Sequence, residues 1–195
     1  MTLATPEDKL EAVRIITNTF DQNPSVNIVI GSGGNRRKKI RRLGNYAFIK
    51  AMNRSGAYIS SNRQGAALCF VSDLKGTNFA EFWAELRFAL VIPPKKVVQT
   101  LKRESYIKKH RFKGKHLYFW FLGVEKGGGQ AVFEMKDHIF ELSAKEQLPI
   151  LLETSVARNR EVYERYGFEV YHTWDNSGDG KALWFMIRKL KTNEA

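Results

Sequence analysis

Apolar residues recur along this chain with two spacings, which predict two kinds of secondary structure. Spacings of three and four residues predict helices over 6–20, 36–53, 78–91, 95–110, 131–146 and 159–166. Continuous or alternating apolar runs predict strands over 56–60, 66–72, 116–124, 148–152, 168–171 and 182–187. The segments 2–4 and 26–30 are too short to assign, although 2–4 has room for an edge strand.

Residues that end helices or form turns separate these segments. Thr5-Pro6 begins the first helix, Pro93-Pro94 ends the third, and Gly167 ends the last. Turns or breaks are predicted at 31–35, 62–65 and 174–180, and 189–195 has the composition of a frayed polar tail. Since no repeat, linker or shift in composition marks a boundary, we predict a single domain over 1–195.

The range 116–124 carries the strongest strand signal. Its sequence, His-Leu-Tyr-Phe-Trp-Phe-Leu-Gly-Val, is nearly continuous in apolar and aromatic residues. Such a run is typical of a central strand that is covered on both faces. Together with the hairpin over 56–72 and the helices on either side of both, it favours an α/β fold in which helices cover both faces of a mixed sheet.

The composition excludes two other classes of protein. Hydrophobic residues make up 43% of the chain and aromatic residues 12%, which is too much for an intrinsically disordered protein. No apolar run approaches the roughly 20 residues of a membrane-spanning helix, and the N-terminus has neither a basic leader nor an apolar signal segment. We therefore expect a soluble cytoplasmic protein with no membrane partner.

The chain is strongly basic, with a formal net charge of +12 and a pI near 9.8. A positive field attracts phosphates, acidic proteins and anionic surfaces alike, so charge alone selects no partner. The densest basic block, 36–42, continues at helical spacing through Ile40, Leu43 and Ala47. We favour a solvated helix face whose apolar side packs on the core; a nucleic-acid-binding stripe is the alternative.

The positions of the cysteine and the histidines do not indicate a reactive thiol or a metal site. Cys69 is the only cysteine and lies in the apolar run 66–71, so we predict a small buried hydrophobe. The four histidines, His110, His116, His138 and His172, show no metal-ligand spacing, and we predict no metal site.

A strand, a loop, a helix and a second strand follow one another within 148–171. The apolar run 148–152 is followed by Glu153, and the helix after it begins the motif Asn159-x-x-x-Tyr163-x-x-x-Gly167-Phe168. This segment resembles the terminal half of the GNAT superfamily of acyl-CoA N-acyltransferases, in which the same motif recurs. The order of the other elements is similar to that family over most of the chain, although only 116–171 carries specific motifs.

The resemblance implies a fold and an activity. The sheet would be mostly antiparallel, with 116–124 and 149–154 as fourth and fifth strands that splay apart, and 131–146 would be the cofactor helix. The activity implied is N-acetyltransfer from acetyl-CoA directly to an amine acceptor, which the sequence does not identify. A longer acyl group is an alternative if the pocket near 119–121 is enlarged, and the protein would act as a monomer or a homodimer.

The glycine-rich segment 127–131 lies between a predicted strand and a predicted helix. Unpaired N–H groups and the helix dipole favour an anion at such a position, and the resemblance implies that the CoA pyrophosphate binds there. This loop is shorter than the family's loop, and its residue order differs. The donor-binding residues that we predict are Leu122, Gly123, Val124, Gly127, Gly128, Gly129, Gln130, Ala131, Asn159 and Tyr163.

Amine acylation also needs a proton donor for the leaving thiolate and an acceptor for the amine proton. The resemblance assigns the first role to Tyr163, whose ordinary pKa of about 10 lies near that of an alkyl thiol; a core tyrosine is the alternative. Because 117–122 contains no carboxylate, we predict Glu153 as the base, with a structural hydrogen-bond acceptor as its alternative. His116 and His172, which we expect at the surface, are further candidates.

A second hypothesis about function remains open. The altered glycine loop, the missing strand carboxylate and the net charge of +12 are also compatible with a module that does not catalyse a reaction. Such a module would bind acyl-CoA, or nucleic acid through its basic surface.

Overall fold

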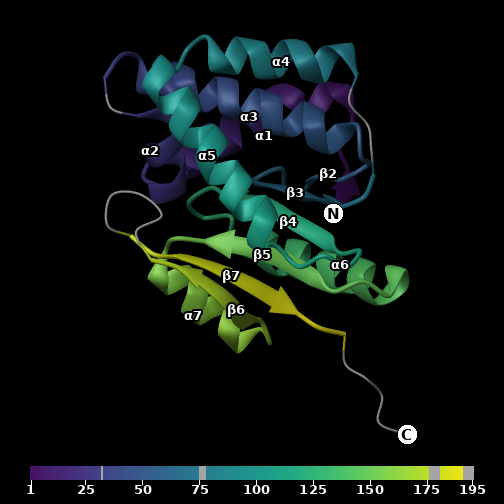
Figure 1. Ribbon diagram of the computed structural model, residues 1–195. Coiled ribbons are helices and arrows are strands. Elements are labelled where there is room, and N and C mark those ends of the chain that lie inside the picture. The colour runs from purple at the N-terminus through teal and green to yellow at the C-terminus, as the bar shows by residue number, and fades with distance from the viewer. Residues whose placement is uncertain (32, 75–77, 176–180, 191–195) are drawn as a thin grey trace, which may run out of the picture.

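One seven-stranded sheet runs through the computed structural model, which describes residues 1–31, 33–74, 78–175 and 181–190 (Figure 1). Its strand order is β1-β2-β3-β4-β5-β7-β6. All neighbouring strands are antiparallel except β4 and β5, which are parallel. The strands are β1 (Thr2–Leu3), β2 (Ala57–Ile59), β3 (Gly65–Val71), β4 (Leu117–Val124), β5 (Ile150–Thr154), β6 (Glu169–Trp174) and β7 (Leu183–Arg188).

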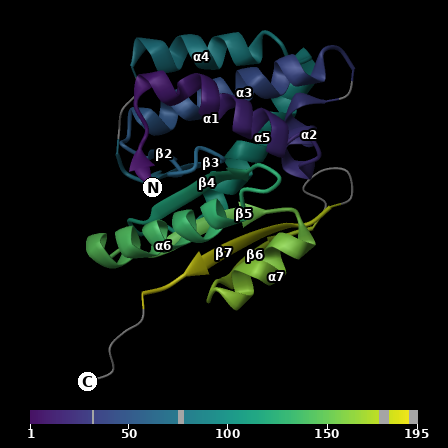
Figure 2. The same cartoon turned by 180° about the vertical axis from the view of Figure 1, so that it is seen from behind.

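The helices cover both faces of this sheet. Figures 1 and 2 show α5 in front of the strands in one view, and α6 and α7 in front of them in the opposite view. The helices are the 3-10 turn η1 (Pro6–Asp8), α1 (Lys9–Thr19), α2 (Pro24–Ile30), α3 (Arg36–Met52), α4 (Phe79–Ala89), α5 (Pro94–His110), α6 (Gly129–Glu146) and α7 (Ala157–Arg165). The predicted α/β class, with a mixed and mostly antiparallel sheet, is therefore confirmed.

The predicted elements agree with the observed ones apart from α2, which the sequence left unassigned. Asn23 caps this helix by accepting a hydrogen bond from Val26 N (3.2 Å), and Pro24 occupies its first turn. The pair Asn23-Pro24 was therefore a helix start rather than only a break. Parts of three predicted loops or tails, namely residues 32, 176–180 and 191–195, lie outside the described residues.

The central feature of the sheet is the divergence of β4 and β5. The two strands pair only through Leu117 with Ile150 and Tyr118 with Leu151, although β4 continues to Val124 and β5 to Thr154. On its other edge β4 stays paired with β3 along its whole length. The predicted splay of the fourth and fifth strands is thereby confirmed.

Two apolar clusters lie on opposite faces of the sheet. One joins α1, α2 and α3 to β3 and β4, and includes Ile16, Phe48 and Phe121. The other joins α6 to β4, β5 and the α7 end, and includes Met135 and Phe168. The basic helix α3 belongs to the first cluster through Ile40, Leu43 and Ala47, so its apolar side packs on the core as we predicted.

Two buried residues illustrate how closely these layers approach. A Cβ at Gly123 would lie 2.5 Å from Thr19 Oγ1, so only glycine lets α1 lie this close to β4. Cys69 on β3 is fully buried, and burial raises the pKa of its thiol to about 12. Cys69 is therefore the inert hydrophobe that we predicted.

Among the described residues, no helix is long and apolar enough to cross a membrane.

Helix α4 differs from its expected packing. Its apolar positions at helical spacing predicted an amphipathic helix, but they do not form its buried face: Phe79 is 75% exposed and Phe82 55% exposed. The buried residues of α4 are Glu81, Ala84 and Phe88. A hydrophobic pattern identifies a helix but does not say whether its apolar face meets the core.

A buried ion pair explains this orientation. Arg54 Nη1 lies 2.9 Å from Glu81 Oε2, and their side chains are only 9% and 4% exposed. Asn53 Nδ2 donates to the same carboxylate (3.1 Å), and Asn78 Nδ2 donates to Asn53 Oδ1 (2.8 Å). Since an unpaired buried charge is costly, these contacts hold α4 with Glu81 facing α3.

We expect Glu81→Ala to lower the free energy of unfolding by about 3–5 kcal/mol, because it leaves the Arg54 guanidinium buried without its carboxylate. Urea denaturation measures the change. The control is Glu85→Ala, one turn further along α4, whose side chain is exposed and which should alter stability by less than about 0.5 kcal/mol. Equal effects of the two substitutions would contradict the role given to the ion pair.

Candidate active site

Two cavities lie on either side of the splay between β4 and β5. The larger has a volume of about 370 Å³ and is bounded by α2, α4, α5 and the two strands. The smaller, about 260 Å³, lies between β4, α6 and α7. Four residues line both cavities, namely Phe119, Leu122, Asn159 and Tyr163. The cavities therefore meet where the strands separate.

Tyr163 occupies this meeting point because of how α7 ends. Gly167 adopts a φ of 83°, and Phe168 N donates to Tyr163 O (3.0 Å), which closes the helix. The Tyr163 ring packs on Phe168 with ring centroids 5.5 Å apart. Burial raises the pKa of Tyr163 to about 12, so its phenol remains a proton donor throughout the neutral range.

Asn159 lies one turn before Tyr163 on the same helix. The residue at the N-cap of α7 is Val156, so Asn159 is the third residue of the helix and does not cap it. Thr154 Oγ1 accepts from Val156 N (3.2 Å) at the turn between β5 and α7. The side chain of Asn159 is thus available to both cavities that it lines.

The glycine-rich loop lies beside the smaller cavity. Val124 before the loop and Val132 after it both line that cavity. Gly127 has a φ of 87°, and nothing lies within 4 Å of a Cβ at Gly127 or Gly129. The loop is fixed by Gly128 N donating to Glu125 O (3.0 Å) and Ala131 N donating to Gly128 O (2.8 Å).

The predicted donor-binding residues divide into three groups. Leu122, Val124, Asn159 and Tyr163 line the smaller cavity. Gly127 and Gly128 lead into the 18-residue helix α6, which begins at Gly129 and continues through Gln130 and Ala131; the N–H groups and dipole at this helix start suit an anion. Gly123 faces α1 instead, where it permits the close contact with Thr19.

Glu153 lines the larger cavity but is held by two other side chains. Arg111 Nε and Nη2 donate to its two carboxylate oxygens (2.9 and 3.2 Å), and Tyr118 OH donates to Oε2 (2.8 Å). The Arg111 guanidinium lies 4.0 Å from the centre of the Tyr118 ring. Burial opposes the charge of Arg111, but Tyr118 and Glu153 more than offset it, so the pKa of Arg111 is raised.

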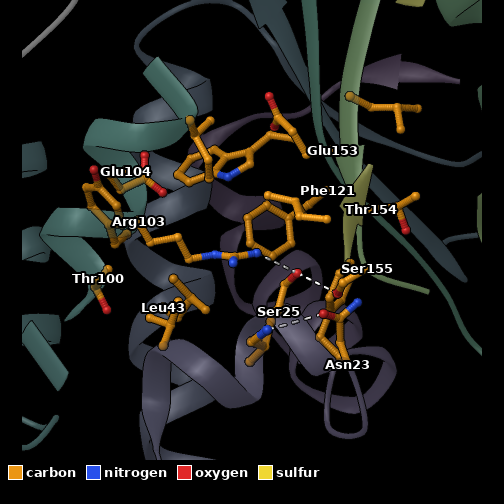
Figure 3. Close-up of a pocket in the computed structure, with 18 of the residues that line it drawn as sticks. Asn23, Ser25, Leu43, Thr100, Arg103, Glu104, Phe121, Glu153, Thr154 and Ser155 are labelled. Atoms are coloured by element: carbon orange, nitrogen blue, oxygen red, sulfur yellow. Dashed lines mark hydrogen bonds between the residues drawn. The ribbon is translucent and has the colours of Figure 1, made fainter. Parts of the chain in front are cut away.

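A polar group lies in another part of the larger cavity. Arg103 is 5% exposed and extends toward Ser25, to which its Nη2 donates (3.2 Å), as Figure 3 shows. The hydroxyl groups of Ser25 and Ser155 are hydrogen-bonded to each other (2.8 Å). The Thr100 hydroxyl, also in the wall, has no hydrogen-bond partner within the described part of the chain.

Sequence reasoning missed Arg103, Arg111, Tyr118 and Ser25. Arg111 is 42 residues from Glu153, and Ser25 is 78 residues from Arg103. No local pattern connects residues at such separations, so only the fold reveals these pairs. Tyr118 lay within a predicted strand, but nothing indicated which cavity its hydroxyl would face.

The two histidines considered as bases do not line either cavity. His116 was expected at the surface but is 4% exposed, and its Nδ1 contacts Gly114 O (2.7 Å). His172 contacts Tyr106 OH (3.1 Å) through Nε2. No group of three or more His, Cys, Asp or Glu residues that could hold a metal occurs among the described residues.

No protein-family model and no curated protein matches this chain. Solved structures do resemble it, among them a histone acetyltransferase HPA2 and related acetyltransferase from Corynebacterium glutamicum (16% identity, 100% of this chain and 97% of that one, TM-score 0.69). Another is polyamine N-acetyltransferase from Drosophila melanogaster (10% identity, 94% and 96%, TM-score 0.64). A third is the C-terminal condensation domain of Ebony in complex with beta-alanyl-dopamine (11% identity, 96% of each chain, TM-score 0.63).

At these low identities the likeness establishes the fold. The chain has the GNAT fold over nearly its whole length, as the motif in 159–168 indicated. The similarity to a condensation domain also means that the fold alone does not decide the acyl donor.

The buried His116 generates a prediction about pH. Burial, opposed by its contact with Gly114 O and reinforced by Arg111, lowers the pKa of His116. A lowered pKa in the folded state means that unfolding takes up a proton as the pH falls. The stability from neutral His116 is therefore present above its ordinary pKa of about 6.5 and is lost below it.

We expect the melting temperature to fall between about pH 7.5 and about pH 5.5, with His116 contributing at most about 1.4 kcal/mol per pH unit. In His116→Asn the fall should be smaller, whatever the absolute stability of that variant. Lys115→Asn is the control, because Lys115 is an exposed neighbour. An unchanged pH dependence in His116→Asn would disprove the assignment.

Proposed function

We propose that this protein is an N-acyltransferase that moves the acetyl group of acetyl-CoA directly to the amine of an acceptor. The observation that carries the proposal is the meeting of two chemically different cavities at Tyr163 and Asn159, in the splay of a GNAT fold. One cavity would receive the donor and the other the acceptor, so that the reacting groups meet between the strands.

The smaller cavity suits the donor. Its wall is mainly apolar, as the pantetheine arm requires, and its one charged residue, Lys136, is paired with Asp137 (Nζ to Oδ1, 2.6 Å). Open space surrounds Gly127 and Gly129, and the N–H groups of Gly128 and Ala131 are already bonded within the loop, so the N–H groups of Gly127, Gly129 and Gln130 would face the pyrophosphate at the start of α6. Leu122, Val124 and Asn159 would contact the pantetheine arm between the loop and the splay.

The larger cavity suits the acceptor. Aromatic side chains such as Tyr46 and Trp120 form part of its wall, and the carboxylates Glu85 and Glu104 lie in the same wall. The Lys50 ammonium already lies over the Tyr46 and Trp120 rings (5.3 and 5.2 Å from the ring centres), so the two carboxylates are the groups that would attract the ammonium group of an acceptor. The structural neighbours named above include enzymes whose names refer to histone and polyamine acetylation, which supports an amine as the acceptor class.

Direct transfer would proceed in balanced steps. The acceptor nitrogen attacks the thioester carbonyl carbon, forming a C–N bond and a tetrahedral oxyanion. Residues of β4 beyond Tyr118 have no β5 partner, so N–H groups near 122–124 would stabilise that oxyanion. The C–S bond then breaks, and Tyr163 OH donates its proton to the leaving thiolate. The extra proton on the acceptor nitrogen passes to solvent water, and water returns a proton to the Tyr163 phenolate, so the products are the amide and the CoA thiol.

The role of Glu153 changes when its contacts are considered. We first predicted it as the base that removes the amine proton. Arg111 and Tyr118 donate three hydrogen bonds to its carboxylate, which occupy lone pairs that a base would need. We therefore propose that Glu153 chiefly positions Arg111 and Tyr118 in the acceptor wall.

A nucleic-acid-binding module is less well supported than the transferase. Part of the basic block in 36–42 is already engaged: Arg36 Nε lies 2.7 Å from Asp21 Oδ1, and Arg37 Nη2 donates to Asn18 Oδ1 (3.0 Å). Lys39 is buried and donates to Ile30 O and Gly33 O (3.1 and 2.7 Å). These contacts reduce the number of cations available for phosphates.

We expect Tyr163→Phe to lower kcat by about 10²–10⁴-fold, because it removes the proton donor and leaves the ring. Release of free CoA thiol from acetyl-CoA with an amine panel measures the rate, and calorimetry should show nearly unchanged CoA binding. Tyr166→Phe is the control, since Tyr166 lines only the smaller cavity. Absence of CoA binding to the native protein at near-millimolar concentration would overturn the proposed function.

Glu153→Gln separates a base from a positioning residue. We expect kcat to fall less than about tenfold and the free energy of unfolding to fall by about 3 kcal/mol, because the buried Arg111 loses its carboxylate. A base would instead lose about 10²–10⁴-fold and the acidic limb of its pH–rate profile. Glu104→Gln is the control, because Glu104 is an exposed carboxylate in the same cavity wall.

A further inference from the structure

The outer face of α4 carries a row of large apolar side chains, Phe79, Phe82, Trp83, Leu86 and Leu90, which we term the α4 stripe. Phe79 is 75%, Phe82 55%, Trp83 41% and Leu90 76% exposed. Their spacing places them on one side of the helix. In both views α4 lies at the outer edge of the helical layer, with no described element beyond it (Figures 1 and 2).

The exposure of the α4 stripe is built into the fold. A half-turn of α4 about its axis would bury the stripe against α3, but it would also take Glu81 away from Arg54. The ion pair and the bonds from Asn53 and to Asn78 hold the polar side inward. The rings also contact one another, with Phe79 and Phe82 centroids 5.7 and 6.1 Å from Trp83. The buried ion pair therefore keeps the apolar side of α4 exposed to solvent.

We propose that the α4 stripe is the interface through which two copies of this chain associate. If each large side chain has on the order of 200 Å² of surface, the exposed fractions give about 500 Å² of apolar surface per copy. A twofold contact would then cover about 1,000 Å², which is the threshold for a specific interface. Neighbouring polar residues at the rim would add to that area.

Charge favours a second copy at this face. Two chains of net charge +12 repel each other over most of their surfaces. The exposed charges on α4 are Glu85 and Arg87, which cancel, so the stripe is a neutral region of a basic molecule. A helix that lies on anionic lipid carries an excess of Lys and Arg beside its apolar face, and α4 has none.

The two sides of α4 connect this interface to the acceptor cavity. Glu85, Phe88 and Ala89 line the larger cavity, whereas the α4 stripe faces outward. A second copy would therefore support the helix that forms one wall of that cavity. The association itself does not depend on the protein being a transferase.

Sedimentation velocity over a concentration series tests the proposal on the full chain. We expect the native mass to rise from 22.4 kDa toward twice that value. Phe79→Asp combined with Phe82→Asp should remain at 22.4 kDa at every concentration, with its melting curve showing that it is folded. Leu10→Asp, at a residue on α1 that is 84% exposed, is the matched control and should associate as the native chain does.

A spin label locates the contact. Ala80→Cys places a label beside the stripe, and the buried Cys69 does not compete for the reagent. A dipolar coupling between labels at Ala80→Cys supports the interface, and a coupling only at Leu10→Cys overturns it. The proposal also fails if the native chain stays monomeric, if the Asp variant still associates, or if the monomer binds phosphatidylserine vesicles through the stripe.

Discussion

The parallel pairing of β4 and β5 ends after two residues on each strand. The candidate site exists because the two strands separate beyond that point. Main-chain groups in the middle of a sheet normally bond to the next strand, and leaving them unpaired is costly. Here the strands separate while β3 stays paired with the outer edge of β4, through one bulge at Leu68 and Cys69, and β7 stays paired with the outer edge of β5. The opening is therefore a fixed part of the sheet, and a ligand that lies in it meets donors that already point the right way.

The two sides of this opening are built differently. On one side α6 and α7 provide a short apolar passage that begins at a helix N-terminus. On the other side α4 and α5 enclose a larger space with charged groups in its wall. At the base of the opening, Arg111, Tyr118 and Glu153 join α5's end to both strands through charge-assisted hydrogen bonds. This cluster ties the wall of the larger cavity to the sheet.

The sequence predicted the features of the fold that depend on residues close together in the chain. The apolar run of β4, the helix with Asn159 and Tyr163, and the stop at Gly167 are local patterns, and the structure has each at the predicted place. The prediction of Glu153 as the base could not take Arg111 into account, because a contact across 42 residues leaves no local signal. The outward face of α4 has no local signal for the same reason, since it depends on Arg54 in the turn after α3.

Because Cys69 is buried, the rate at which its thiol reacts can be used to measure transient separation of β3 from the neighbouring strands. Its thiol lies on β3 between β2 and β4, fully enclosed, and its backbone N–H donates to Gly56 O (2.8 Å). Any reagent that modifies it must wait until β3 parts from its neighbours or the chain unfolds. The rate at which a thiol reagent modifies this lone cysteine would therefore report how often the centre of the sheet becomes exposed to solvent.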